Sequence, residues 1–298
     1  MSTQSSAPSN QSKRLDLKQT TLAAPLRFDG VGLHTGEPAT VDVQPAEPDT
    51  GIVFLLRSNR DAVTTVCVPA IADNVVETSR ATVIGSNGAS VSTTEHLLSA
   101  LLACGVSNAR ISVEGPEIPI RDGSAQEFVA AIDRAGIVVQ QRPRTVMALA
   151  EPYVLRAGDR MIAAFPAPAF RVRFVADFAP PIGSQYYDGE IDADVYRRDI
   201  AGARTFGYLH EVEALRARGL ARGGSLDNAL VFAADGPMQP LRWPNEVVRH
   251  KVLDLVGDFA LLGSWPQMEI VAFKSGHEMH ARATLELRGI MKENAWEP

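Results

Sequence analysis

The pattern of hydrophobic and polar positions predicts strands and then helices in the N-terminal half of the chain. Between residues 27 and 57, short stretches alternate between apolar and polar positions and are broken by Gly and Pro, as strands and turns are. Leu and Ala recur at helical spacing over residues 92–104, and Gly105 supplies a helix end. A strand over 108–114 and a second helix over 124–135 follow.

The C-terminal half repeats this order of elements. Residues 151–178 alternate as strands, and an apolar helix is expected over about 245–262. A strand over 267–274 and a helix over about 278–291 come next. Because the same order occurs twice, the sequence predicts an α+β fold made of two similar domains that arose from a duplicated unit, each with a layered sheet and helices.

The expected domain limits follow from this repeat. Residues 1–16, rich in Ser, Gln and Asn, are expected to be a disordered tail, followed by a first domain over 17–143 and a second over 144–298. The second domain carries an insertion over about 205–230, whose amphipathic helix includes Val212, Leu215 and Leu220. Within it, the pair Gly223-Gly224 either makes a turn or lets the backbone approach a ligand closely.

Composition narrows the class of protein. With 298 residues, the chain is long enough for two domains. Its net charge of −6, without a basic face, argues against a nucleic-acid partner. Apolar runs fall short of the ~18 residues that a membrane span requires. Cys67 and Cys104 lie in apolar contexts, which indicates buried thiols in a reducing compartment. The absence of an apolar signal segment indicates that the protein stays in the cytoplasm.

A polar stripe interrupts the apolar helix predicted over 245–262. His250, Asp254 and Asp258 follow one another at four-residue spacing, so their side chains project from one face. Their neighbours in the sequence are apolar, and an unpaired buried charge is costly. Either a metal ion bound by His and Asp or an internal ion pair would compensate these carboxylates.

A second polar cluster lies at the start of the helix predicted over 92–104. There, Glu95 and His96 could supply a general base and a metal ligand. The alternative is structural, because Ser92 and Glu95 have the spacing of a capping box, which would explain the carboxylate as a helix cap.

A third cluster, at residues 274–280, contains His277 and His280. Spacing alone leaves two metal sites open: His250 and Asp254 with His96, or His277 and His280 with a carboxylate. We expect His280 to lie on the surface, because it follows the strand end among charged residues. Three ligands, a carboxylate base and a histidine acid are what metal-assisted hydrolysis needs, and ligands from both halves would place the site in the cleft between the domains.

Seven short motifs occur in order along the chain: VGLHTG at 31–36, STTEHL at 92–97, PEIPIRDGSA at 116–125, RTFG at 204–207, GGS at 223–225, HKVLD at 250–254 and KSGH at 274–277. In these motifs the sequence resembles the UDP-3-O-acyl-N-acetylglucosamine deacetylase family. The resemblance extends from about residue 18 to the C-terminus.

The resemblance implies a cytoplasmic zinc amidase, with iron(II) as an alternative metal in the cell, which we expect to be a monomer. Such an enzyme removes acetate from UDP-3-O-(3-hydroxyacyl)-N-acetylglucosamine, the committed step of lipid A biosynthesis in Gram-negative bacteria. It also implies that the helices of the two domains pack face to face. By resemblance, the zinc ligands are His96, His250 and Asp254.

The same resemblance implies roles for other residues. Glu95 would be the general base on the attacking water, and His277 would stabilise charge and donate a proton to the leaving amine. We hypothesise, from helical phase and resemblance, that Asp258 holds His277 in its cationic form. The hydroxyl of Thr205 would bond the water or the oxyanion.

Substrate contacts are expected from the same half of the chain. Lys251 and Phe206 would contact the anionic, sugar-bearing substrate, with Gly224 as a further contact. Tyr208, Leu215 and Leu220 would form the passage for the acyl chain. An acidic protein that binds a diphosphate needs local positive charge, for which Lys251, Arg249 and Arg204 are candidates.

Two other interpretations stay open at the level of sequence. A different metal-dependent amidohydrolase would use the same ligands and base on another acylated substrate. A non-catalytic sugar-nucleotide-binding protein would use the same polar residues as structural ion pairs.

Overall fold

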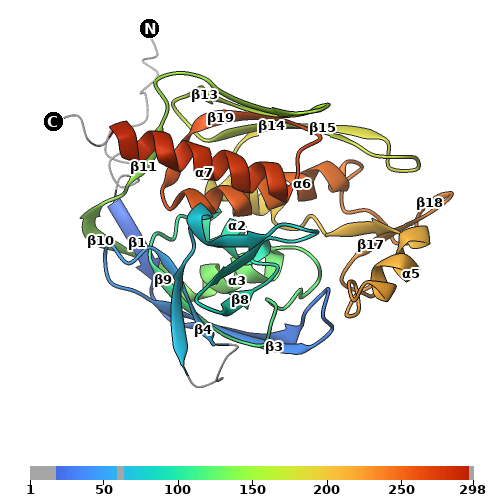
Figure 1. Ribbon diagram of the computed structural model, residues 1–298, viewed down its shortest axis with the longest axis horizontal. Helices are drawn as coiled ribbons and strands as arrows, with labels where there is room; N and C mark the ends of the chain where they lie inside the picture. Colours follow the sequence, from blue (N-terminus) through green and yellow to red (C-terminus); the bar gives the residue numbers. More distant parts are fainter. Residues whose placement is uncertain (1–17, 59–63, 295–298) are drawn as a thin grey trace, which may run out of the picture.

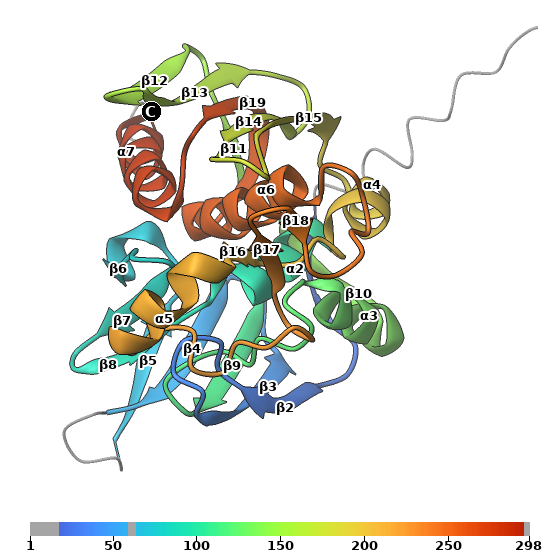
Figure 2. The same cartoon turned by 90° about the vertical axis from the view of Figure 1, so that its right-hand side faces the viewer.

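The computed structural model describes residues 18–58 and 64–294, so the tail expected over 1–16 lies outside the described residues. Four layers make up the molecule: a sheet, two layers of helices, and a second sheet (Figures 1 and 2). The helices of the two halves therefore face each other across the centre, as the resemblance implies.

The first large sheet is antiparallel except at one pair of strands. Its order is β2-β3-β9-β4-β5, with β9 antiparallel to β3 and parallel to β4. Along β3, buried and solvent-facing positions alternate, so one face packs on the helices, as the period-two pattern predicts. The strands are β2 (Leu26–Val31), β3 (Pro38–Pro45), β4 (Ile52–Arg57), β5 (Thr65–Pro69) and β9 (Ala109–Glu114).

The second large sheet repeats the first. Its order is β12-β13-β19-β14-β15, with β19 antiparallel to β13 and parallel to β14, and β11 (Val146–Ala148) pairs with the start of β19. This equivalence confirms the predicted α+β fold of two similar units. The strands are β12 (Tyr153–Ala157), β13 (Arg160–Pro166), β14 (Arg171–Asp177), β15 (Ser184–Glu190) and β19 (Trp265–Phe273).

Four helices fill the space between the sheets: α2 (Glu95–Ala103), α3 (Gln126–Ala135), α6 (Glu246–Phe259) and α7 (His277–Asn294). All residues of α6 except Arg249 and Lys251 are buried, and α6 continues into the short helix η3 (Ala260–Leu262). Helices α2 and α6 contact each other at the centre of the molecule. Buried apolar side chains from both halves form one continuous core there.

Gly257 allows the close contact between α2 and α6. A Cβ atom at this position would lie 2.1 Å from the carbonyl oxygen of Glu95, far inside van der Waals contact. The absence of a side chain at one position of α6 therefore sets the distance between the two central helices, which carry the polar residues singled out above.

Smaller elements connect these layers. Strand β1 (Lys18–Leu22) pairs with β10 (Ile137–Pro143), and β6 (Val75–Glu77), β7 (Val83–Ser86) and β8 (Ala89–Val91) form a small sheet before α2. The short helices η1 (Ala72–Asn74), α4 (Ala193–Val195) and η2 (Tyr196–Ile200) complete the connections.

The expected insertion forms a separate lobe at one side of the molecule (Figure 1). It comprises β16 (Phe206–Tyr208), α5 (Leu209–Ala217), β17 (Leu230–Ala233) and β18 (Gly236–Pro237). Its helix is confirmed, but Leu220 lies beyond the helix end, and no residue of α5 is fully buried. The helix therefore covers the surface instead of entering the core.

One expectation about the cysteines is wrong. Cys104 is buried as predicted, whereas Cys67 is exposed, because it lies on the outward face of the edge strand β5. Among the described residues, none of the helices combines the length and apolar character that crossing a membrane requires.

Candidate active site

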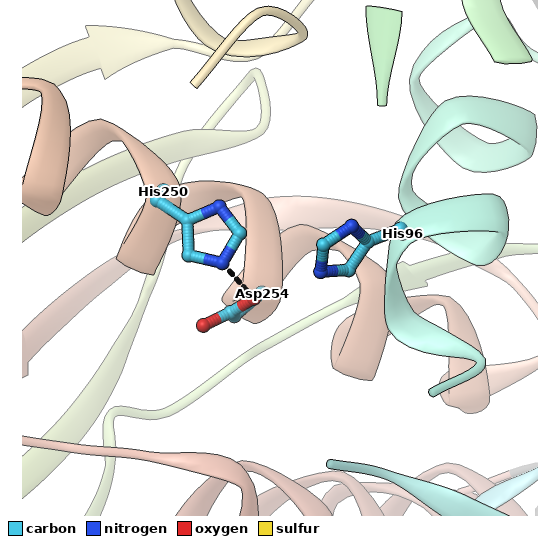
Figure 3. A group of neighbouring side chains, drawn as sticks. All are labelled: His96, His250 and Asp254. Atoms are coloured by element: carbon cyan, nitrogen blue, oxygen red, sulfur yellow. Dashed lines mark ion pairs between the residues drawn. The ribbon is translucent and has the colours of Figure 1, made fainter. Parts of the chain in front are cut away.

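A cavity of about 340 Å³ lies where α2, α6 and α7 meet the insertion. It brings together Glu95 and His96 from α2, His250, Lys251 and Asp254 from α6, and His277 from α7. Figure 3 shows His96 directed from α2 toward His250 and Asp254 on α6. The remaining lining residues are Leu33, His34, Thr78, Arg80, Thr93, Arg160, Phe178, Thr205, Phe206, Gly276 and Glu278.

His96, His250 and Asp254 have the geometry of a metal site. Their nearest ligand atoms all lie within 4.8 Å of one another, and Nε2 of His250 is 3.3 Å from Oδ1 of Asp254. Tetrahedral zinc with bonds of ~2.0–2.2 Å separates neighbouring ligand atoms by about 3.3 Å. Because Nδ1 of His250 donates to the carbonyl oxygen of Ala203 at 3.0 Å, its Nε2 keeps a free lone pair toward the group.

The electrostatics of this group suit a cation. Burial lowers the pKa of His96 to about 3 and also lowers the pKa of His250, so both rings are neutral ligands. Burial alone would raise the pKa of Asp254, but His250 and Lys251 outweigh it and keep the carboxylate ionised. Lys251 donates to its Oδ2 at 2.7 Å. Two neutral nitrogens and one carboxylate oxygen are a donor set that zinc accepts.

Glu95 is not a helix cap, so the capping-box alternative is wrong. Thr94 occupies the N-cap position of α2 without a side-chain cap bond, which makes Glu95 the first helical residue. Its Oε2 accepts a hydrogen bond from the backbone N–H of Thr82 at 3.0 Å, and Oε1 lies 3.8 Å from Nε2 of His277. Burial raises the pKa of Glu95 to about 8, against the opposing effect of His277.

His277 is positioned by Asp258, the last residue of the polar stripe. Its Nδ1–H donates to Oδ2 of Asp258 at 2.8 Å, which leaves Nε2 directed toward Glu95 and Asp254. Burial alone would lower the pKa of His277, but Asp258, together with Glu95 and Asp254, raises it to about 9. The ring is therefore a cation at neutral pH.

His280 is buried, so the expectation of a surface position is wrong. The helix α7 begins at His277, and the next turn directs His280 inward against α6 and β14 instead of outward after the strand. Its Nδ1–H donates to Oδ2 of Asp258 at 2.8 Å, and its Nε2 lies 2.9 Å from Oγ of Ser275. Neighbouring charged residues in the sequence say nothing about which face of a helix a residue occupies.

The second metal alternative consists of Asp258, His277 and His280, which also lie close together. Here, both nitrogen-to-oxygen distances are 2.8 Å, the length of a hydrogen bond to a carboxylate. Both Nδ1 atoms therefore carry a proton that they donate to the carboxylate, which leaves them no lone pair for a cation. The geometry therefore favours the group of His96, His250 and Asp254 as the metal site.

Thr205 and Phe206 line the cavity at the start of the insertion. The backbone of Thr205 is held on both sides, since its N–H donates to Gly123 at 2.7 Å and its carbonyl oxygen accepts from Leu230 at 2.8 Å. The ring of Phe206 meets His250 edge-on with the centroids 6.1 Å apart. Thr205 and an aromatic wall are thus part of the cavity lining.

The cationic side chains that line the cavity differ from those that the sequence predicted. Lys251 lines it, but Arg204 is paired with the buried Glu246 at 2.8 Å, and Arg249 lies over the rings of Tyr187 and Trp243. Neither of these two guanidinium groups belongs to the lining residues. The cavity instead has two further cations that the sequence did not suggest, Arg80 and Arg160.

Tyr208, Leu215 and Gly224 lie outside the set of residues that line this cavity. Tyr208 packs in a small apolar cluster, and its hydroxyl donates to the carbonyl oxygen of Ala179 at 2.6 Å. Leu215 lies on α5 and is partly exposed. The glycine pair packs against another loop: a Cβ at Gly223 would lie 2.2 Å from the carbonyl oxygen of Gly32.

Sequence reasoning missed residues that organise the site. Glu117 is fully buried and accepts hydrogen bonds from the backbone of His34 and Thr35 and from the hydroxyl of Thr93, so it fixes the loop over residues 32–36 beside the cavity. Thr82 bonds both Glu95 and Asp258. His34 and Glu117 lie within matched motifs, which was a usable signal, whereas nothing in the sequence pointed to Thr82.

Comparison with known proteins places this site in context. The family model described as UDP-3-O-acyl N-acetylglycosamine deacetylase matches residues 19–288. Similar proteins with the name UDP-3-O-acyl-N-acetylglucosamine deacetylase occur in Syntrophotalea carbinolica, 46% identical over 88% of this chain and 85% of that protein, and in Phenylobacterium zucineum, 47% identical over 83% and 85%. A relative of the same name from Nostoc is 42% identical over 89% of this chain and 96% of that protein.

Proposed function

Because the chain belongs to the UDP-3-O-acyl N-acetylglycosamine deacetylase family, we propose that it hydrolyses the N-acetyl group of UDP-3-O-(3-hydroxyacyl)-N-acetylglucosamine. The proposed reaction is the committed step of lipid A biosynthesis, and we propose that it takes place in the cytoplasm. The observation that carries the proposal is the convergence of three metal-ligand side chains, a carboxylate and a cationic imidazole on one cavity. Each of these groups has a part in amide hydrolysis.

His96, His250 and Asp254 would hold the metal, for which we propose zinc, with iron(II) as the alternative in the cell. When bound, the metal supplies Lewis-acid activation of the attacking water and of the amide carbonyl. Glu95, whose pKa burial raises to about 8, would be favoured in its ionised form by the positive charge of a bound cation nearby.

Glu95 and His277 carry out the two proton transfers of the reaction. Glu95 takes a proton from the water as its oxygen bonds to the acetyl carbon, and the hydroxyl of Thr205 donates to the oxyanion that forms. Nε2–H of His277 then donates to the amine as the carbon–nitrogen bond breaks, which releases acetate and the free amine. Asp258 stabilises the cationic ring through its Nδ1–H.

Substrate binding divides between cations and apolar side chains. Lys251, Arg80 and Arg160 line the cavity and provide positive charge for the diphosphate of the substrate. Leu33, Phe178 and Phe206 form its apolar wall, and Phe178 and Phe206 contact edge-on at 5.1 Å between centroids. We propose that the acyl chain follows this wall toward the insertion, where Tyr208, Leu215 and Gly224 remain candidate contacts.

Acetate release from UDP-3-O-(3-hydroxymyristoyl)-N-acetylglucosamine by chelator-stripped protein, with and without one equivalent of zinc, tests the proposal. We expect activity only with metal, and a loss of about 10²- to 10⁴-fold in Glu95→Gln, which keeps the metal ligands but removes the base. UDP-N-acetylglucosamine without the acyl chain is the matched control and should react far more slowly. A folded, metal-loaded protein that releases no acetate from the acylated substrate would exclude this function.

A further inference from the structure

His280 lies beside the proposed proton donor without a role in the reaction described above. It is fully buried on α7, one turn after His277, and the centroids of the two rings are 6.2 Å apart. Its Nδ1 lies 2.8 Å from Oδ2 of Asp258, the same oxygen that accepts the Nδ1–H of His277. Two imidazole rings therefore share one carboxylate oxygen.

The proton positions in this group follow from its chemistry. An ionised carboxylate only accepts hydrogen bonds, so both imidazoles present a protonated Nδ1 to Asp258. Ser275 Oγ lies 2.9 Å from Nε2 of His280 and can donate its hydroxyl proton there. Since full burial disfavours a second cation, His280 is a neutral ring whose Nδ1–H tautomer is fixed from both sides.

Asp258 is consequently held by three hydrogen-bond donors. Its Oδ1 accepts the hydroxyl of Thr82, which precedes β7, and its Oδ2 accepts the two imidazole donors of α7. His277 has its own orientation fixed through this carboxylate, and its Nε2 lies 3.8 Å from Glu95. A rotation of the carboxylate would therefore displace the Nε2 that faces the reacting groups.

We propose that His280 is a positioning residue, whose Nδ1–H holds the Asp258 carboxylate in the orientation that directs Nε2 of His277 at the leaving nitrogen. The proposal rests on the proposed function, because that function makes His277 the proton donor. A packing role is the alternative, since the ring also meets Phe174 edge-on with the centroids 6.3 Å apart.

Two amide substitutions separate these roles. The side-chain amide of Asn reaches the place of Nδ1 and can donate to Asp258, whereas the amide of Gln reaches the place of Nε2, next to Ser275. We expect His280→Gln to lower kcat about tenfold with unchanged KM and metal content, as loss of an outer hydrogen-bond partner typically does. His280→Asn should keep kcat close to that of the wild type.

A control and a spectroscopic measurement complete the test. The control is Thr284→Val, one turn after His280 on α7. It removes a hydroxyl that donates to the carbonyl oxygen of His280 and does not contact Asp258, so kcat should stay unchanged. In the proton spectrum of the substrate-free protein, the downfield Nδ1–H signal of His277 should move in His280→Gln and stay in place in His280→Asn. Thermal unfolding verifies that each variant folds, and His280→Leu replaces a Gln variant that does not.

Equal kcat in His280→Gln and the wild type would overturn the proposal. Equal losses in the Asn and Gln variants would also overturn it, because they would show that the shape of the ring matters and its donor does not. If the wild type fails to deacetylate the acylated substrate, the proposed function is wrong. Only the proton spectra then test whether His280 positions His277 through Asp258. A His277 signal that moves only in the Gln variant supports the connection through Asp258, and any other pattern excludes it.

Discussion

At the scale of single residues, neighbouring charges decide how each buried imidazole is used. His96 and His250 lose their tendency to protonate because burial outweighs the carboxylate near them. His277 is slightly more exposed and bonds Asp258 directly, and its pKa rises to about 9. One cavity thus contains neutral rings suited to bind a cation and a charged ring suited to donate a proton.

Asp258→Asn should shift the basic limb of the pH–rate profile to lower pH. The protonated form of His277 is the proposed donor, so activity falls as pH rises through its pKa of about 9. The amide removes the charge that raises this pKa, while burial continues to lower it. Profiles of kcat/KM across the neutral and alkaline range measure the shift.

Asp188→Asn is the matched control for that experiment, because Asp188 pairs with Arg171 on the outer sheet, away from the cavity lining. Its basic limb should coincide with that of the wild type. An unchanged basic limb in Asp258→Asn would refute the role of Asp258.

At the scale of elements, the pair α2 and α6 forms the site. Glu95 and His96 open α2, whereas His250, Asp254 and Asp258 follow one stripe of α6. Two helices can bring these residues together only if their axes approach closely, and Gly257 makes that approach possible. Packing and the geometry of the site therefore depend on the same contact.

Gly257→Ala should destabilise the protein by about 1–3 kcal/mol and lower its metal affinity, since the new Cβ would force α2 and α6 apart. Denaturant unfolding and metal titration measure the two effects. The matched control is Gly289→Ala on α7, where a Cβ meets no atom within 4 Å; its better helix propensity should stabilise the fold by up to about 1 kcal/mol. Equal stabilities of the two variants would contradict a close helix contact at Gly257.

At the scale of the whole molecule, the proposed metal site draws its residues from both sheet-and-helix units. His96 follows the small sheet of the first unit, while His250 and Asp254 lie on the central helix of the second. One bound cation would therefore add a link between them. The division into domains at residues 143 and 144, at the end of β10, stays a prediction.

Zinc should raise the thermal unfolding temperature of the chelator-stripped protein, because the folded state assembles ligands that the unfolded chain keeps apart. At a free concentration of 100 times Kd, the expected stabilisation is about 2.7 kcal/mol. His96→Ala should abolish most of the effect, whereas His210→Ala, on the exposed face of α5, should leave it intact. A zinc-induced shift that survives in His96→Ala would place the metal elsewhere.

Much of this organisation could be predicted from the sequence, because it depends on local periodicity. The helices over 95–103 and 246–259 and the repeated order of elements appear in the spacing of apolar residues. The stripe of His250, Asp254 and Asp258 follows from the period of a helix alone. Matched motifs then identify the family, since they preserve the order of the polar residues along the chain.

The tertiary structure alone decided which of these residues meet. Whether Glu95 caps its helix or bonds elsewhere depends on Thr82, a distant residue whose N–H donates to its carboxylate. Whether His280 lies outside or inside depends on how α7 packs. The cations Arg80 and Arg160 come from separate segments of the chain. A sequence pattern records the neighbours of a residue along the backbone, whereas burial and charge depend on neighbours in space, and only the folded chain brings these together.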